Sequence, residues 1–208
     1  MEFTKYDDLL EYVGVQLPDC PKVLITQTIR RIARRFCEET QAWQYDLSPI
    51  RIRKDKSDYD LDLDEITCAE IFRVWNVRLV KNEDVNPKGT VLDPNRDWTL
   101  KGDNHRTFHF LNKPTETISK GLRIRVALRP TRNANEIEKF MFDEYYEAIA
   151  AGVMAMLMRI PRKPWTNTRE ARNMLTDFDN GVAVARIDVS RGFTNMEIMN
   201  NTGASFAV

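Results

Sequence analysis

The chain has 208 residues and contains 31 Lys and Arg against 31 Asp and Glu, so its formal net charge at pH 7 is zero. This balance gives no chain-wide reason to expect binding to nucleic acid or to a membrane surface, although it allows local charged patches. A hydrophobic fraction of 42% beside 30% charged residues is typical of a globular chain, and this length is enough to bury a substantial core.

The opening stretch MEFTKYDDLLEYV contains acidic side chains and no apolar segment, so we expect no secretory or transit peptide.

Two helices are expected before residue 44. A short helix is predicted from about Thr4 to Val13, ending near Gly14. A longer helix is predicted from Pro21, because small and apolar residues recur there with a helical period. These residues are Ile25, Ile29, Ile32, Ala33, Phe36, Cys37 and Thr40.

The other face of the longer helix is strongly charged. Such a face could bind phosphates, but no aromatic residues alternate with the arginines and no DNA-binding motif surrounds them. We therefore favour a solvated face that two glutamates partly neutralise. Its charged residues are Arg30, Arg31, Arg34, Arg35, Glu38 and Glu39.

The cysteines and histidines do not predict a metal site. Cys20, Cys37 and Cys68 lack CxxC spacing, which favours buried, reduced thiols in a reducing compartment. His105 and His109 are the only histidines, and neither an HxH nor an HExxH motif contains them. No P-loop, GxGxxG or GxSxG motif is present either. We therefore predict no metal, no cofactor and no catalytic residues.

After Trp43 the hydrophobic period changes from that of helices to that of strands. Alternation at 50–53, 59–64 and 122–129, with β-branched and aromatic residues between, predicts five to seven short antiparallel strands packed as a small sandwich. The alternating aspartates of 60–64 resemble the start of a calcium loop. However, Glu65 and Ile71 stand where such a loop needs glycine and glutamate, so a strand with a wet acidic face is predicted instead.

Helical periodicity returns after residue 131. Asn135 and Glu138 have capping-box spacing and predict a helix start at Asn135. The uncharged run 148–158 is too short to cross a bilayer, which needs about 20 residues, so a buried helix is predicted that ends at the prolines of 161–164.

A second capping signal, Asn167 with Glu170, starts the last predicted helix. Its apolar residues are Ala171, Leu175, Phe178, Val182, Ala185 and Val189. From Gly192 onward the periodicity is lost, which predicts an extended tail.

The sequence therefore predicts an α+β fold in three parts. Residues 1–43 and 132–192 are expected to form one helical bundle, because each amphipathic helix needs a partner for its apolar face. Residues 44–131 are expected as an inserted antiparallel β-sandwich-like domain. Residues 193–208 are expected as an extended C-terminal tail.

Two stretches carry a resemblance to a known family. They are LPDCP…TIRRIARRFCEETQAW near the N-terminus and FDEYYEAIAAGVMAMLMRIPRKPWTNTREARNMLTDFDNGVAVAR near the C-terminus. They resemble the tail adaptor proteins of short-tailed bacteriophages, also called head-to-tail connectors or tail tubular proteins. The second stretch is the more specific, with its small-residue helix and its turn ending in Pro164 and Trp165. The turn departs from the family pattern at Arg162, where a glycine is expected before Lys163.

The resemblance implies a structural protein of the virion. Identical subunits would form a dodecameric ring beneath the portal protein, joining the head to the tail nozzle or fibres. DNA would pass through the channel without specific recognition, which suits a chain with no net charge. We expect a monomer that assembles in the host cytoplasm and becomes a ring at the head-tail junction, with no membrane partner and no enzymatic activity.

The same resemblance places the interface on the helical hairpin and on the tail. We expect the small-residue helix and its proline turn to form the core of the ring, and the tail to become ordered on the portal. The candidate portal or ring interface residues are Gly152, Met156, Trp165, Phe193, Met196, Ile198, Met199 and Phe206.

One alternative from another functional class remains open. A carbohydrate-binding β-sandwich module with helical arms could use Trp43, Trp75 and Trp98 as stacking platforms for sugar rings. An enzyme would need a pocket that has no signature in the sequence.

Overall fold

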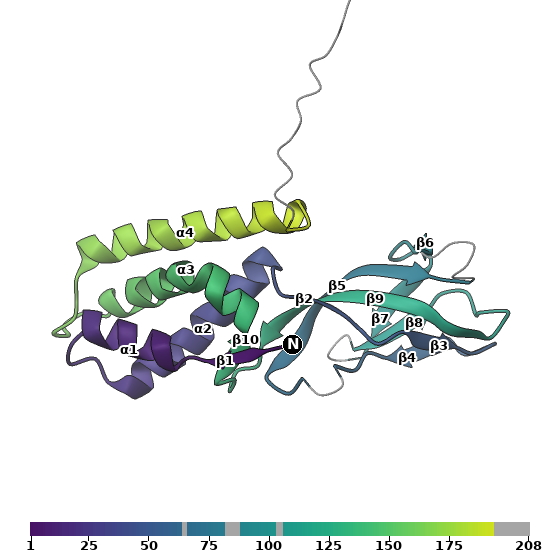
Figure 1. Ribbon diagram of the computed structural model, residues 1–208, viewed down its shortest axis with the longest axis horizontal. Coiled ribbons are helices and arrows are strands. Elements are labelled where there is room, and N and C mark those ends of the chain that lie inside the picture. Colours follow the sequence, from purple (N-terminus) through teal and green to yellow (C-terminus); the bar gives the residue numbers. More distant parts are fainter. Residues whose placement is uncertain (64–65, 82–87, 103–105, 194–208) are drawn as a thin grey trace, which may run out of the picture.

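The computed structural model describes residues 1–63, 66–81, 88–102 and 106–193 (Figure 1). Within these ranges the chain is a mixed α/β protein with four helices and open β-sheets. The helices gather at one end of an elongated molecule, and the other end is built of strands (Figure 1). The predicted combination of helices and antiparallel strands is confirmed.

The four helices are α1 (Asp7–Gln16), α2 (Lys22–Thr40), α3 (Lys139–Met158) and α4 (Thr168–Ser190). Helix α2 confirms its prediction, since all seven of its predicted apolar and small residues are buried. The prediction for α1 was wrong at both ends: the helix begins at Asp7 and continues through Gly14 to Gln16. A β-carbon at Gly14 would meet nothing within 4 Å, so this glycine sits on an open face and interrupts no packing.

Helix α3 begins later than the capping signal predicted, because a strand pairing replaces its expected first turn. Residues Glu136–Glu138 form strand β10, antiparallel to β1 (Phe3–Lys5). The amide of Lys139 donates a hydrogen bond to the carbonyl of Glu2 (2.8 Å), which satisfies a free N–H group at the helix start without a side-chain cap. The Asn135 side chain instead accepts from Arg30 of α2. The predicted cap at Asn135 was therefore wrong.

The predicted cap of α4 is confirmed. The Asn167 side chain accepts a hydrogen bond from the amide of Glu170 (3.1 Å). Of the six predicted apolar residues of this helix, all are buried except Leu175, which is half-buried.

Eight further strands lie among the described residues between 44 and 130. They form one sheet with the order β2-β9-β5-β6, in which β3 also pairs with β9, and a second sheet with the order β4-β8-β7. Every strand-to-strand pairing is antiparallel. The strands are β2 (Gln44–Asp46), β3 (Ile50–Ile52), β4 (Asp58–Asp60), β5 (Ala69–Leu79), β6 (Thr90–Val91), β7 (Trp98–Lys101), β8 (Thr107–Phe110) and β9 (Ile118–Pro130).

The prediction of five to seven short strands was wrong in number and in length. Strands β5 and β9 have 11 and 13 residues, and they run side by side from the helices to the far end of the molecule (Figure 1). Two register shifts, at 71–73 and 74–76, accompany this pairing. Such irregularities let a long ribbon bend, which a regular alternation of residues in the sequence does not reveal.

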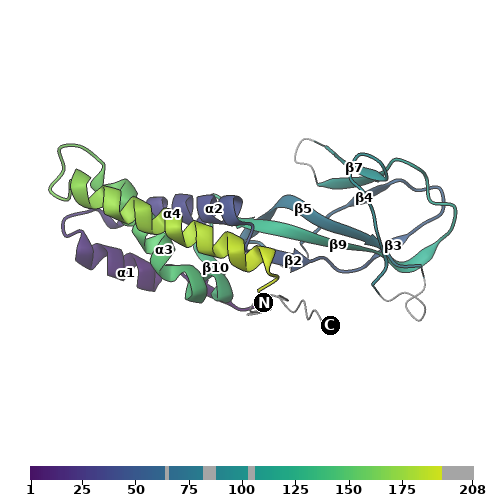
Figure 2. The same cartoon turned by 90° about the horizontal axis from the view of Figure 1, so that it is seen from above.

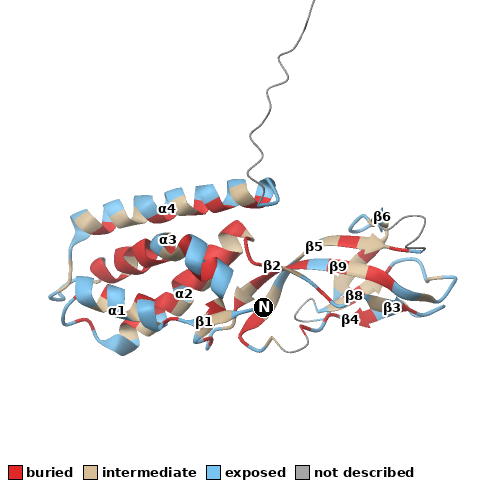
Figure 3. Ribbon diagram, in the orientation of Figure 1, coloured by how far each residue is buried: buried red, intermediate tan, exposed pale blue. Residues whose placement is uncertain are grey.

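Buried side chains run through both ends of the molecule (Figure 3). The uncharged run of α3 is buried as predicted, apart from Ala148 and Met156, which are half-buried. None of the described helices is long and apolar enough to span a bilayer. Cys20, Cys37 and Cys68 are buried free thiols, as predicted. Burial raises the pKa of Cys68 to about 11, which keeps this thiol protonated and unreactive.

Close helix packing surrounds Gly152 of α3. A β-carbon built on this residue would come within 2.5 Å of the Phe178 ring of α4 and within 2.8 Å of the Ile32 side chain of α2. Gly181 of α4 makes a similar approach, since its β-carbon would lie 2.3 Å from that of Ala148. Helices α2, α3 and α4 therefore pack at a distance that only glycine allows at these two points.

A ring of charged hydrogen bonds joins α2 to the long strands. The Arg34 and Arg129 guanidinium groups both bond the same Glu70 oxygen at 2.7 Å. Arg129 also bonds Glu38 at 2.6 Å, and Arg34 lies 3.2 Å from the same Glu38 oxygen. We call these four residues the Arg–Glu joint. Because Arg34 and Glu38 lie in it, the prediction that the α2 charges form only a solvated face was wrong for these two residues.

We predict that Glu70→Gln weakens the fold mainly above acidic pH. Burial alone would raise the pKa of Glu70, but the hydrogen bonds and charges of Arg34 and Arg129 outweigh it and hold the pKa below its usual range. A lowered pKa in the folded state stabilises the fold above the unfolded pKa of about 4.3, and this contribution is lost as the pH falls through the folded pKa.

Urea unfolding at neutral pH should give a free energy of unfolding lower by about 1–2 kcal/mol for Glu70→Gln. The difference should shrink as the pH is lowered below about 4. As a control, Glu116→Gln should change little, since its pair with Lys81 is more than half exposed on both sides. Equal losses for the two variants would contradict the role of the joint.

We predict that Gly152→Ala destabilises the helix packing by about 1–3 kcal/mol, because the added methyl group overlaps an aromatic ring and a β-branched side chain. Gly14→Ala is the matched control, since its added methyl group meets open space. The control should be neutral or more stable by up to about 1 kcal/mol, because alanine favours helix. Thermal and urea unfolding measure both, and a neutral Gly152→Ala would show that the helices can separate without cost.

Candidate interaction surface

The structure does not bring the four predicted interface residues that it describes into one patch. Gly152 is buried under its own helices, so it can affect an interface only through their packing. Met156 and Trp165 are half-buried near the turn before α4, whereas Phe193 follows the other end of this 23-residue helix. The two ends of α4 are about 35 Å apart. The predicted residues Met196, Ile198, Met199 and Phe206 lie outside the described residues.

The turn that carries Trp165 has the conformation that glycine favours. Arg162 has a φ of 58°, in the left-handed region, at the position where the family resemblance leads one to expect glycine. The turn is held by the Thr166 hydroxyl, which donates to the carbonyl of Ile160 (2.5 Å) and accepts from the amide of Lys163 (2.9 Å). Arg162 therefore adopts this turn at the cost of local backbone strain.

Phe193 is 40% exposed and contacts Phe140 at the start of α3, with ring centroids 5.5 Å apart in an edge-to-face arrangement. Phe140 is itself 42% exposed. The described chain therefore ends beside a small aromatic patch. This patch is the structural support for the tail prediction, which otherwise concerns residues outside the described ranges.

A large groove lies between α1, α3 and α4. It has a volume of about 690 Å³, and an adjoining hollow of about 600 Å³ continues it along the start of α3. Their lining residues include six carboxylates and no basic side chain. We call the two together the acidic groove. Its carboxylates are Asp8, Asp143, Glu144, Glu147, Asp177 and Asp188.

Tyrosines shape the interior of the acidic groove. The Tyr145 hydroxyl donates to the Asp188 carboxylate of α4 (3.2 Å), and the Tyr146 hydroxyl donates to the carbonyl of Asp8 in α1 (3.4 Å). The Tyr146 ring also packs edge-to-face on Tyr12, with centroids 5.9 Å apart. Burial, and then the neighbouring carboxylate of Asp188, raise the pKa of Tyr145. Both tyrosines are therefore neutral hydrogen-bond donors that position three helices around the groove.

Arginines gather on the opposite side of α4, where Glu39 pairs with two of them, Arg35 and Arg186. A smaller cavity of about 190 Å³ lies there between α2, α3 and α4, with Arg35 and Arg159 among its lining residues. Arg31 lies one turn before Arg35 on α2, and Arg172 lies one turn before Leu175, which also lines the cavity. We call these four arginines the basic face.

The arginines of the basic face differ in whether their charge is paired. Arg35 pairs with Glu39 (2.6 Å) and lies 5.1 Å from the centre of the Phe178 ring. Arg31, Arg159 and Arg172 are exposed and form no ion pair with any residue that the structure describes. Figure 2 shows α4 crossing the other helices, with α2 on one side and α1 and α3 on the other. This helix therefore separates the acidic groove from the basic face.

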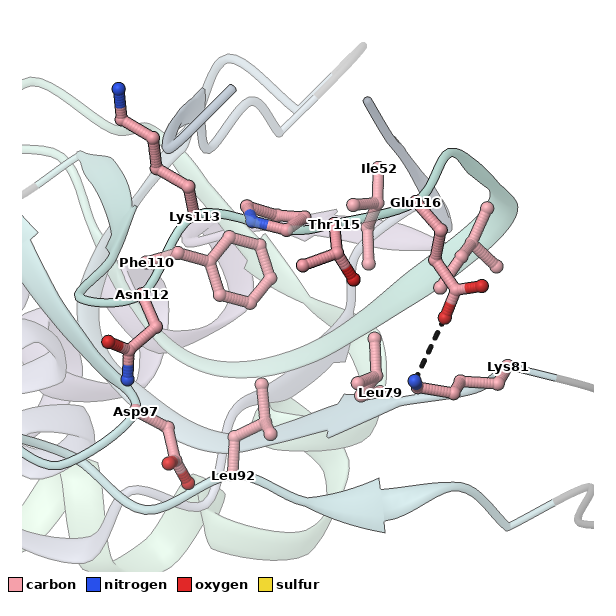
Figure 4. Close-up of a pocket in the computed structure, with 12 residues that line it drawn as sticks. Ile52, Leu79, Lys81, Leu92, Asp97, Phe110, Asn112, Lys113, Thr115 and Glu116 are labelled. Carbon is pink, nitrogen blue, oxygen red and sulfur yellow. Dashed lines mark ion pairs between the residues drawn. The ribbon is translucent and has the colours of Figure 1, made fainter. Parts of the chain in front are cut away.

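Two further hollows lie in the strand region. One, of about 220 Å³, is lined by apolar side chains that include Ile52, Leu79 and Phe110, with the Lys81–Glu116 pair (2.9 Å) at its edge (Figure 4). The other, of about 680 Å³, contains Trp75 and several basic residues. Arg125 in this second hollow is bound to Asp46 by two hydrogen bonds of 2.7 and 2.8 Å.

Two of the three tryptophans cannot serve as the sugar platforms that the alternative function would need. Trp43 is fully buried, and Trp98 is 7% exposed and stacks on Phe108 with centroids 5.4 Å apart. Only Trp75 is open, at 44% exposure, and its ring nitrogen donates to Gln41 (2.9 Å). Two of the three rings therefore belong to the core and offer no face to a ligand.

The described part of the chain contains no cluster of three or more His, Cys, Asp or Glu residues that could hold a metal ion. His109 lies 2.7 Å from the exposed Asp58 carboxylate on the neighbouring strand, and His105 lies outside the described residues. Asp60 and Asp62 are exposed, as the prediction of a wet acidic face requires, whereas Asp64 and Glu65 are not described.

Sequence reasoning missed the acidic groove. The signal was present, because Asp143, Glu144 and Glu147 lie within one turn of a helix that is otherwise apolar. The sequence could not predict that Asp8 and Asp177 also line the groove, since they belong to other helices, whose placement beside α3 the sequence does not specify. A comparison with protein-family models found no match, and neither did a comparison with curated proteins.

We predict that Arg162→Gly stabilises the turn by about 1 kcal/mol, because it removes the β-carbon from a left-handed backbone position. The melting temperature should rise by about 2–4 °C. Lys163→Gly, next to it but without a positive φ, is the control and should lower the melting temperature. If both variants melted below the unchanged chain, the backbone strain at Arg162 would be disproved.

Proposed function

We propose that the chain is a structural protein of a short-tailed phage virion, a head-to-tail adaptor that forms a ring beneath the portal. The ring connects the capsid to the tail nozzle or fibres and continues the DNA channel. The sequence resemblance at both ends of the chain suggested this function. The structure adds one supporting observation, namely the acidic groove and the basic face on the two sides of α4.

A closed ring of identical subunits needs two different, complementary surfaces on each subunit. The acidic groove and the basic face meet this requirement in charge, and their placement on opposite sides of one helix layer meets it in geometry (Figure 2). This observation carries the proposal, because a monomeric enzyme or a single-site binding module does not need such a pair.

The parts of the chain then have distinct roles. We propose that residues 1–43 and 132–192 act as the helical bundle of the ring and that residues 44–131 act as an inserted sandwich-like domain directed toward the tail proteins. The aromatic patch of Phe140 and Phe193 supports portal binding near the tail 193–208, because exposed aromatic pairs favour interfaces. The zero net charge suits DNA passage without specific recognition.

The experiment is co-elution of the purified chain with the portal of the same virus. We predict that the full chain elutes with the portal in size-exclusion chromatography, and that a chain ending at residue 192 keeps its circular dichroism spectrum but elutes alone. A portal from an unrelated phage is the control and should bind neither form. If the full chain failed to bind its own portal, the adaptor proposal would be refuted.

A further inference from the structure

We propose that the acidic groove of one copy binds the basic face of the next copy, so that the subunits contact one another head to tail. This inference rests on the proposed function and deepens it, because it names the occupant of the groove as a second copy of this chain. The contact is heterologous, since it joins two different surfaces.

The charges of the two surfaces are complementary. Six carboxylates line the acidic groove without any basic neighbour in the lining. On the other side of α4, Arg31, Arg159 and Arg172 are exposed and have no ion-pair partner among the described residues. Carboxylates accept the two-pronged hydrogen bonds that arginine donates, so the groups left unpaired in one copy are partners for those of another.

The same charges exclude a symmetric dimer through either surface alone. In a two-fold contact each surface meets itself, which would place carboxylates against carboxylates or arginines against arginines. A head-to-tail contact brings opposite charges together and leaves one free surface at each end. Further copies can then add to the free surfaces until a ring closes, as an adaptor beneath a symmetric portal requires.

The groove also offers apolar and aromatic surface to arginine side chains. Tyr12 is 42% exposed at one wall, and Val184 of α4 is 55% exposed at the other. Arginine stacks on aromatic rings and covers apolar groups with its methylene chain, whereas lysine does this less well. All four cations of the basic face are arginines.

The contact is expected to be weak in the free chain. Exposed ion pairs each contribute little and are screened by salt, so their main effect is on specificity and on the rate of association. On the portal, neighbouring copies are held at a high effective concentration, and the same weak contact then completes a ring. This difference explains how a chain could remain largely monomeric until it meets the portal.

Charge reversal on each surface tests the contact. The groove variant carries Glu147→Lys and Asp177→Lys, and the basic-face variant carries Arg159→Glu and Arg172→Glu. All four side chains are exposed and unpaired, so the variants should fold, which circular dichroism and thermal unfolding check. Two control variants reverse charges outside both surfaces: Asp60→Lys with Asp62→Lys, and Arg51→Glu with Arg132→Glu.

Sedimentation velocity is measured on the full chain at high protein concentration and low salt. The unchanged chain should self-associate, with a dissociation constant that rises by at least about tenfold when the salt is raised to about 0.5 M. Each surface variant alone should associate at least about tenfold more weakly than the unchanged chain, because two of its charged residues now face like charges on the next copy. An equal mixture of the two variants should associate better than either alone, since the introduced lysines of one variant can face the introduced glutamates of the other. The control variants should behave like the unchanged chain.

Three results would overturn the inference. They are a monomeric unchanged chain at low salt, surface variants that associate as well as the unchanged chain, and a mixture that associates no better than its components. Portal co-elution distinguishes failure of the head-to-tail contact from failure of the adaptor proposal. If the chain binds its portal as a ring but charge reversal changes nothing, the adaptor stands and the head-to-tail contact fails. If the mixture associates but the chain binds no portal, the head-to-tail contact stands and the adaptor proposal fails.

Discussion

The close approach of α3 to α4 is the constraint on which the two candidate surfaces depend. Gly152 lets the Phe178 ring and the Ile32 side chain fill the space that a β-carbon would occupy, and Gly181 does the same against Ala148. Because α4 is held against α3 in this way, its two flanks become the walls of two separate hollows. A wider helix spacing would merge these hollows, and the separation of acidic from basic side chains would be lost.

The Arg–Glu joint extends this constraint into the strand region. Helix α2 contributes Arg34 and Glu38, and the long strands contribute Glu70 and Arg129, so one network of two cations and two anions spans three elements. Its members are only partly exposed, between 18% and 33% for their side chains, which protects the charges from full screening by solvent. Strands β5 and β9 then continue without interruption to the far end of the molecule (Figure 1). The helices and the strands are therefore mechanically connected, as a protein that joins two parts of a virion would need.

Local periodicity predicted the elements better than it predicted their ends and partners. The core of α2 and the cap of α4 followed from residue spacing alone, because both depend on side chains a few positions apart. The start of α3 did not, since β1 comes from the other end of the sequence and its pairing with β10 outcompetes the local cap at Asn135. The charged side of α2 was only partly predicted for the same reason, because Arg34 bonds Glu70 and the carbonyl of Pro130, which lie 36 and 96 positions away in the sequence. Trp43 and Trp98 belong to the core, as tryptophans with apolar neighbours in the sequence usually do.

The sequence shows the carboxylates that α3 contributes to the acidic groove, but it does not show the groove itself, since three helices supply its walls. Its chemical meaning depends on the central claim that the chain forms a ring on a portal. Native mass spectrometry of the chain mixed with its portal tests that claim most directly, because it counts the copies bound. We predict one bound copy per portal subunit, or nearly so, and no stable partial rings when the portal is in excess. A chain that stays unbound, or that binds as scattered single copies without filling the ring, would contradict it.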